Sequence, residues 1–385
     1  MTGPKVLLVA AEASGDALGA GLARAIRARR PDATFVGVGG AQMAREGIVS
    51  PFDITELSVL GLLEGVAAYP RVRRRVKEAV AFAAREKPDI AVLIDSWGFT
   101  LRVAHGLRKL DPKLPLVKYV GPQVWASRPG RAKTLARSVD LLLSIHGFDA
   151  PLFEAEGLKT IPVGNPALAR DFSAADPARL RERLGAGADD PILLILPGSR
   201  PSEIKRLAEP LGVAAAVLRA DRPKLHLVIP VAAPVAGLVR EATAGWAAPP
   251  MLIEDDAGKA DAFVGATAAL ACSGTVSTEL ALAGCPMVIC YRLGSLTYAI
   301  LKRLIRTRYV TLFNVAAKRE IARELIQDAC TGDALAQAVA PLLDDPARRE
   351  AQTAEQTAAL DLMGRWQGDP SGRAADAVLA LLAQQ

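Results

Sequence analysis

Short apolar runs alternate along this chain with longer stretches in which apolar residues recur every three or four positions. A short apolar run indicates a strand buried on both faces, and the longer stretches indicate amphipathic helices. One such helix follows the first run, with Leu18, Leu22 and Ile26 on one side. The alternation predicts a parallel sheet of the doubly wound kind in the first half. Its strands are expected at 5–11, 34–38, 89–94, 116–120, 140–145 and 160–163.

The pattern restarts after a polar stretch at 169–190, and 385 residues are too many for one ordinary core. The sequence therefore predicts two doubly wound (Rossmann-like) α/β domains facing a cleft, 1–168 and 169–364. The tail is expected to be helical, and its last part, about 365–385, can pack back on the first domain. Residues 314–327 are expected to begin as a loop and become a helix. Strands of the second domain are expected at 192–196, 225–230, 251–254, 268–272 and 286–291.

The first run of the second domain ends in a tight turn, Pro197-Gly198-Ser199-Arg200, and a helix follows with Lys205 in its first turns. A turn between a buried strand and a helix N-terminus can leave backbone N–H groups pointing outward, and an arginine adds a planar set of donors. This combination suits a phosphate or pyrophosphate. An ordinary strand–turn–helix corner with a surface arginine fits this stretch alone equally well.

A second turn of the same kind, Ser273-Gly274-Thr275, follows the run at 268–272. Its hydroxyls can bind a phosphate, and its glycine permits close approach. Glu279 lies about one helical turn further on, where an acid can accept hydrogen bonds from ribose hydroxyls. Two such turns in one domain favour a nucleotide-binding site over two ordinary corners.

Loops that follow strands of the first domain carry polar residues at the edge where open α/β sheets bind ligands. The first is Glu12-Ala-Ser14-Gly15-Asp16, in which the glycine allows a sharp turn or close approach of a ligand, and Ser14 or Asp16 could instead cap the helix. Asp95 directly follows another strand and is a candidate general base, although a helix cap is the simpler interpretation.

A third loop of the first domain, at 121–127, is a rigid turn that contains Gln123 and Trp125. A carboxamide and an indole at this edge of the sheet are candidate contacts for the same ligand.

Residues 58–77 combine apolar side chains with a dense group of cations, a pattern typical of helices that lie at a membrane surface. An ordinary amphipathic helix with a solvated face is the alternative. The expected membrane contacts are Val59, Leu60, Leu62, Leu63, Val66, Arg71, Arg73, Arg74 and Arg75.

Composition adds few constraints. The formal charge is +6, a mild excess that does not indicate a nucleic-acid partner. The cysteines Cys272, Cys285, Cys290 and Cys330 form no CxxC pair, which favours a reduced cytoplasmic setting over a zinc site or a disulfide framework. The apolar run near the start is too short for a signal peptide, and no run is long enough to span a membrane. No acidic cluster has the spacing of metal ligands, so neither a metal nor another cofactor is expected.

Six motifs occur in a characteristic order along the chain. They are Glu12-Ala-Ser-Gly-Asp16, Gly121-Pro-Gln-Val-Trp-Ala126, Gly164-Asn-Pro166, Leu196-Pro-Gly-Ser-Arg200, Ser273-Gly-Thr275 with Glu279, and Asn314 with Arg319-Glu320 and Glu324-Leu325. In their order and context these motifs make the chain resemble the lipid-A-disaccharide synthase family of GT-B glycosyltransferases, and the resemblance extends from Val6 to about Gln327.

The resemblance implies transfer of 2,3-diacylglucosamine from its UDP donor to 2,3-diacylglucosamine 1-phosphate, on the cytoplasmic face of the inner membrane. It implies that Asp95 is the base for the acceptor hydroxyl, that Arg200 and Asn314 are catalytic, and that Glu279 contacts ribose. Arg319 and Glu320 are further candidates for the active site. The acceptor-side candidates are Glu12, Ser14, Gly15, Gln123 and Trp125, and those for UDP are Gly198, Ser199, Arg200, Lys205, Ser273, Gly274, Thr275 and Glu279.

One departure from the family pattern follows the aspartate. The family usually continues Ala-Pro-Asp-Phe-Asn, whereas this chain has Ser96-Trp-Gly-Phe-Thr100, so a second acid is missing at Gly98. Any role of that acid cannot be transferred to this chain.

Other interpretations stay open at this point. Another UDP-sugar GT-B transferase or an epimerase would share both phosphate turns, and a non-catalytic sugar-nucleotide sensor at the membrane would share the pattern at 58–77. Family members can exchange C-terminal segments, so a homodimer is a further expectation.

Overall fold

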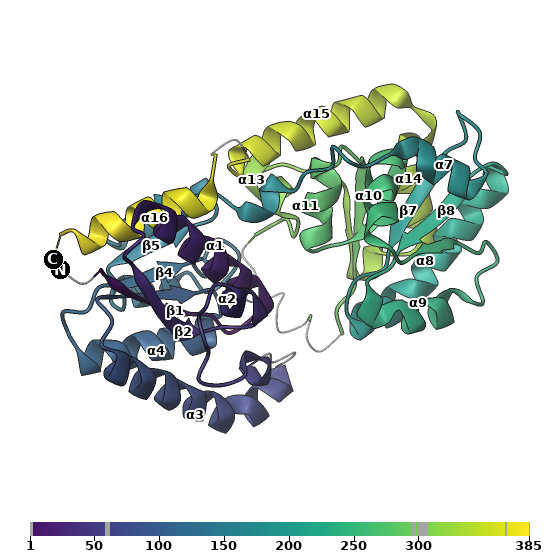
Figure 1. The fold of residues 1–385 in the computed structure, drawn as a ribbon. Helices are drawn as coiled ribbons and strands as arrows, with labels where there is room; N and C mark the ends of the chain where they lie inside the picture. The colour runs from purple at the N-terminus through teal and green to yellow at the C-terminus, as the bar shows by residue number, and fades with distance from the viewer. Residues whose placement is uncertain (1–2, 58–61, 295–297, 299–306, 366–367, 385) are drawn as a thin grey trace. The chain divides into compact units, whose positions relative to one another are not determined.

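The structure, a computed structural model, describes residues 3–57, 62–294, 298, 307–365 and 368–384. The chain separates into two compact units (Figure 1), Met1–Pro166 with Gly364–Gln385 and Ala167–Met363. The chain therefore returns to the first unit after it has completed the second.

The first unit is built around a sheet of parallel strands in the order β2-β1-β3-β4-β5-β6. Its strands are β1 (Lys5–Val9), β2 (Thr34–Val38), β3 (Ile90–Ile94), β4 (Leu116–Tyr119), β5 (Leu141–Ser144) and β6 (Thr160–Pro162). Its helices are α1 (Ala13–Arg29), α2 (Ala41–Arg45), α3 (Leu62–Glu86), α4 (Trp97–Leu110), α5 (Gly130–Ala136), α6 (Ala150–Glu154) and α16 (Pro370–Leu382).

Helices cover both faces of this sheet (Figure 1) because successive side chains of each buried strand point to opposite sides. Val6 and Leu8 of β1 pack on the side of α1 and α16, which contact each other. Leu7 and Val9 pack on the opposite side, with α3 and α4. Both faces are therefore apolar, which explains why the strands appear in the sequence as continuous apolar runs.

The second unit repeats this plan with the strand order β12-β11-β10-β7-β8-β9, all parallel. Its strands are β7 (Ile192–Leu196), β8 (His226–Pro230), β9 (Met251–Ile253), β10 (Ala268–Cys272), β11 (Met287–Tyr291) and β12 (Glu324–Ile326). Its helices are α7 (Pro177–Leu184), α8 (Pro201–Asp221), α9 (Ala236–Thr243), α10 (Asp256–Gly265), α11 (Thr275–Leu282), α13 (Leu312–Ala317), α14 (Gly332–Asp344) and α15 (Pro346–Leu362).

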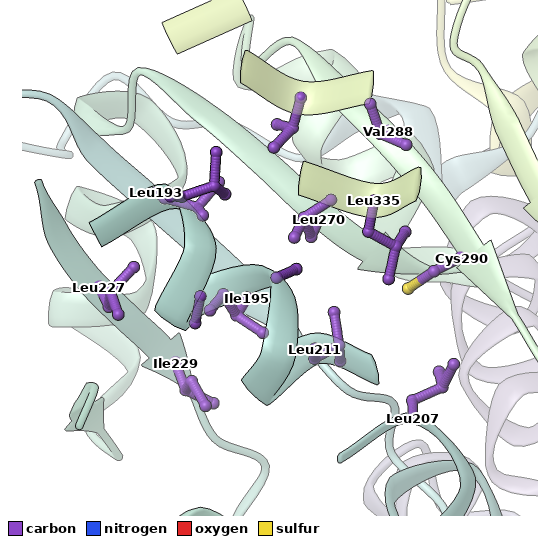
Figure 2. Packing of buried hydrophobic residues seen from close by; sticks show 14 of the residues in the cluster. Leu193, Ile195, Leu207, Leu211, Leu227, Ile229, Leu270, Val288, Cys290 and Leu335 are labelled. Atoms are coloured by element: carbon purple, nitrogen blue, oxygen red, sulfur yellow. The ribbon is translucent and has the colours of Figure 1, made fainter. Parts of the chain in front are cut away.

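The main core of the second unit lies between the sheet and the helices α8 and α14. Figure 2 shows Ile195 of β7 beside Leu211 of α8, with Leu270 of β10 near Leu335 of α14. The predicted α/β class with two doubly wound domains is confirmed.

The helix expected over 314–327 is wrong. Helix α13 ends after Ala317, where Lys318 has a left-handed φ of +56°, and Glu324–Ile326 form strand β12 on the edge of β11. Apolar residues at 321 and 325 fit a helical spacing, but pairing with the open edge of β11 overrides that local preference.

Candidate active site

Each sheet has a point where the order of its strands reverses, because successive strands are added first on one side and then on the other. Ligands of open α/β sheets bind there, at the carboxyl ends of the strands. In the first unit β1 lies between β2 and β3, and Val9 pairs with both Val38 and Leu93. In the second unit β7 lies between β10 and β8, and Leu196 pairs with Ala271. The segments that follow β1, β3, β7 and β10 carry Ser14, Asp95, Arg200 and Thr275, which are among the candidate residues.

Asp95 follows β3 in an unusual backbone conformation. Asp95 and Ser96 have φ values of +46° and +38°, and two such residues in succession cost roughly 1–3 kcal/mol each. The Asp95 carbonyl oxygen accepts hydrogen bonds from Thr100 Oγ1 at 2.7 Å and from Lys118 Nζ. Among the described residues no donor reaches the Asp95 carboxylate, so it does not cap α4. The half-buried carboxylate is thus held at the sheet edge without a structural partner.

The loop after β1 differs in detail from its prediction. Glu12 and Ser14 are exposed, but Asp16 is buried and accepts hydrogen bonds from the backbone N–H groups of Gly40, Gln42 and Met43. Asp16 therefore stabilises the start of α2 and does not cap its own helix.

Gly15 lies inside α1, and a Cβ there would be 3.3 Å from Ala10 Cβ. The glycine therefore allows close packing of helix on strand, and the sharp turn considered for it is not found.

The loops after β4 and β5 contain buried polar groups, two of which, on His146 and Asp149, the sequence prediction did not assign. Gln123 is exposed, whereas Trp125 packs edge-on against Phe148, and His146 stacks on the same ring. Trp125 Nε1, His146 Nδ1 and Asp149 Oδ1 are buried and have no partner among the described residues. Burial lowers the pKa of His146 to about 4 and raises the pKa of Asp149 to about 7. The sequence feature that could have identified this group is the position of His146 just after the buried strand β5.

The Pro197–Arg200 turn is already occupied by an anion of the chain itself. Glu203 is buried, and its Oε2 accepts hydrogen bonds from the backbone N–H groups of Ser199 at 3.1 Å and Arg200 at 3.3 Å. The expectation that these N–H groups point outward is therefore wrong. A glutamate three positions into a helix is the signal for such a capping box.

Glu203 also orients Arg200. Its Oε1 lies 3.1 Å from Arg200 Nη1, while the arginine side chain remains 61% exposed. Gly198 has a φ of +113°, and a Cβ there would lie 2.6 Å from Glu203 Oε2, so only glycine fits this turn. Lys205 is exposed on the next turn of α8. The turn thus presents side-chain cations, Arg200 and Lys205, while its amides are used internally.

The second turn is open, in contrast to the first. No acceptor on the described residues reaches the backbone N–H groups of Thr275 and Val276 at the start of α11. A Cβ at Gly274 would meet no atom within 4 Å, and Ser273 lies beside it, partly exposed. This helix N-terminus can accept an anion without displacing a group of the protein.

Glu279 is paired with a residue that the sequence prediction missed. Its Oε1 accepts from Arg170, whose guanidinium lies 5.0 Å and 5.8 Å from the ring centres of Phe172 and Phe263. The two rings and the ion pair fix the arginine and orient the Glu279 carboxylate.

Asn314 is fully buried, and its amide is saturated with hydrogen bonds. Its Oδ1 accepts from Ile321 N at 2.8 Å and Ala322 N at 3.1 Å. Its Nδ2 donates to Ala322 O and Glu324 Oε1, both at 2.8 Å. This geometry favours a structural role, in which Asn314 holds the turn between α13 and β12, over a catalytic one.

We expect Asn314→Ala to lower the free energy of unfolding by about 3–5 kcal/mol, because three backbone groups of the turn lose a buried partner. Urea unfolding followed by circular dichroism measures this loss. Unchanged stability together with lost turnover would show instead that the amide contacts substrate.

The two neighbouring candidates, Arg319 and Glu320, lie on the turn that Asn314 holds. Arg319 pairs with Glu355 of α15 at 2.7 Å, and Glu320 accepts from the backbone N–H of Glu324.

The expected membrane segment is only partly described. Val59 and Leu60 lie outside the described residues, as do the side chains of Leu62, Leu63 and Val66. Arg71, Arg73 and Arg74 are exposed on α3. Arg75 is 14% exposed, pairs with Glu56 and Glu78, and lies over the Phe52 ring, so it is a poor candidate for lipid contact. Among the described helices, none has the length and apolarity needed to cross a bilayer.

Comparison with known proteins gives a consistent result. The family model for lipid-A-disaccharide synthetase matches residues 6–378. Two curated relatives named lipid-A-disaccharide synthase come from Rhodospirillum centenum, 41% identical over 385 residues, and Paramagnetospirillum magneticum, 42% identical over 382. These alignments cover 99% and 98% of this chain, and 95% and 98% of the respective relatives.

Among solved structures, the S. aureus MnaA–UDP co-structure is similar in fold. Its TM-score is 0.63 at 15% identity, over 98% of this chain and 95% of that one, so the likeness concerns the fold alone. With the family match and the relatives over nearly the whole length, the chain belongs to the lipid-A-disaccharide synthase family, which consists of glycosyltransferases of lipid A biosynthesis.

Proposed function

We propose that this protein transfers 2,3-diacylglucosamine from UDP-2,3-diacylglucosamine to 2,3-diacylglucosamine 1-phosphate, with inversion at the sugar carbon. The products are the β-1′,6 disaccharide 1-phosphate and UDP. The observation that carries the proposal is the division of chemistry between the two sheets. At the reversal point of one sheet lies the Asp95 carboxylate, which has no hydrogen-bond donor among the described residues. At that of the other lie cations and the N-terminus of α11, whose first N–H groups meet no acceptor in the same part of the chain.

The second unit holds the leaving group in this proposal. The backbone N–H groups of Thr275 and Val276 and the side chains of Arg200 and Lys205 bind the diphosphate, and Glu279 accepts from ribose hydroxyls. These fixed positive groups stabilise the charge that develops as the bond between sugar and diphosphate breaks. A divalent metal ion is not needed for this step.

The first unit supplies the base. Asp95 takes the proton of the acceptor 6-hydroxyl as the oxygen forms its bond to the sugar carbon, and general-base help of this kind is worth about 10²- to 10⁴-fold. Glu12, Ser14, Gln123 and Trp125 lie on neighbouring loops of the same sheet edge and are the proposed acceptor contacts.

Both substrates carry acyl chains, so the protein must reach a membrane surface. We propose that the start of α3 lies on the cytoplasmic face of the inner membrane, with Arg71, Arg73 and Arg74 near anionic head groups.

The test is UDP release and disaccharide formation from the two acylated substrates in detergent micelles, with UDP-N-acetylglucosamine as the comparison donor. We expect turnover only with the acylated donor and acceptor together. Epimerisation of UDP-N-acetylglucosamine, or binding without turnover, would replace this proposal by the epimerase or the sensor.

A further inference from the structure

Lys118 is an ionisable residue inside a buried strand. It lies in β4, its side chain is buried, and the space around it is lined mainly by apolar residues. Leu93, Trp97, Leu101, Ala104, Leu135 and Val139 form this lining. A cation in such surroundings loses its hydration without gaining an ion pair at hydrogen-bonding distance. Among the described residues, the partners of its Nζ are a backbone carbonyl and a hydroxyl, and no salt bridge joins Lys118 to an acid. Stability alone would favour a methionine of similar length here.

Within the described part of the chain, the side-chain hydrogen bonds of Lys118 go to the turn that carries Asp95. Its Nζ donates to the carbonyl oxygen of Asp95 and to Thr100 Oγ1, the latter at 2.8 Å. Thr100 Oγ1 in turn lies 2.7 Å from the Asp95 carbonyl oxygen and 3.0 Å from that of Ser96. Lysine and threonine thus hold the carbonyl groups of both left-handed residues, Asp95 and Ser96.

The electrostatics agree with this geometry. Burial lowers the pKa of Lys118 to about 7, and the Asp95 charge opposes that shift. The Asp95 carboxylate is therefore close enough to raise the pKa of Lys118, although the Lys118 amine binds the Asp95 backbone and not its carboxylate.

We propose that Lys118 is a positioning residue, which fixes the strained Asp95–Ser96 turn and so aims the Asp95 carboxylate at the acceptor hydroxyl. The inference rests on the proposed function, in which Asp95 is the base. A carboxylate displaced by about 1 Å can lose on the order of 10²-fold in rate while substrate binding is retained. Lys118 thus acts through Asp95 and does not touch the substrate.

The test compares Lys118→Met with the matched control Lys113→Met, an exposed lysine on the loop before β4. For Lys118→Met we expect kcat to fall about 10- to 100-fold. The KM for each substrate and the affinity for UDP should change less than about threefold, because Asp95 acts in the transition state. Lys113→Met should have the kcat, KM and UDP affinity of the wild type. A melting temperature at or above that of the wild type shows that the loss of kcat is not loss of fold.

Two further variants keep the inference falsifiable. Thr100→Val removes the second group that holds the Asp95 carbonyl and should also lower kcat at unchanged KM. In an Asp95→Asn background, Lys118→Met should not lower kcat further, because the residue through which Lys118 acts is already disabled. A further loss in the double variant, or wild-type kcat in Lys118→Met while Asp95→Asn is inactive, overturns the inference alone. Full turnover by Asp95→Asn overturns the proposed base and this inference together.

Discussion

Asp95→Asn is expected to lower kcat by about 10²- to 10⁴-fold without weakening UDP binding. The amide has the shape of the carboxylate but cannot take the proton of the acceptor hydroxyl. The Asp95 side chain makes no hydrogen bond within the described part of the chain, so the substitution leaves no buried group unpaired and the fold should persist. Turnover is measured with the two acylated substrates, and UDP affinity by calorimetry.

Asp32→Asn is the control for Asp95, since the Asp32 side chain is 50% exposed on the loop before β2 and pairs with the exposed Arg30. It should retain wild-type kcat. Residual turnover of Asp95→Asn above about a tenth of the wild type would assign proton removal to another group.

Arg200→Met is expected to weaken UDP binding by about 10- to 150-fold, because it removes a charged donor from a diphosphate. Arg200→Lys should recover only part of the loss, since a point charge lacks the planar set of donors. The loss should be smaller for UMP, which has one phosphate fewer. Binding is measured directly, in the absence of acceptor.

Arg240→Met is a matched control for Arg200, because its side chain is 63% exposed against 61% and it also pairs with a glutamate. It lies on α9 and should bind UDP as the wild type does. Equal affinities of Arg200→Met and Arg240→Met would remove Arg200 from the diphosphate site.

Most strands could be predicted from the sequence because strands of a parallel sheet are buried on both faces and therefore form continuous apolar runs. β12 could not, since its three residues include Glu324 and its existence depends on the edge of β11. Apolar periodicity records burial, and it does not record which edge a short segment will pair with.

The candidate site shows the same limit. The loops that carry Asp95 and Arg200 could be located because they follow buried strands. The partners of these residues could not, since Glu203 points back into its own turn and Lys118 reaches Asp95 from another strand. Asn314 had the right position for a site residue, but its four hydrogen bonds are visible only in three dimensions. Position along the chain thus identified the loops, and the contacts decide the roles.

The return of α16 to the first unit has a consequence for biosynthesis. Ala374, Ala375 and Val378 of this helix complete the core beneath α1, although they are synthesised about two hundred residues after Pro166. The second unit is continuous in sequence and can fold as soon as it leaves the ribosome. Part of the apolar surface of the first unit therefore stays uncovered until α16 has been synthesised. During that interval we expect the first unit to bind chaperones. Polypeptides that stall before residue 370 should therefore be degraded rather than accumulate.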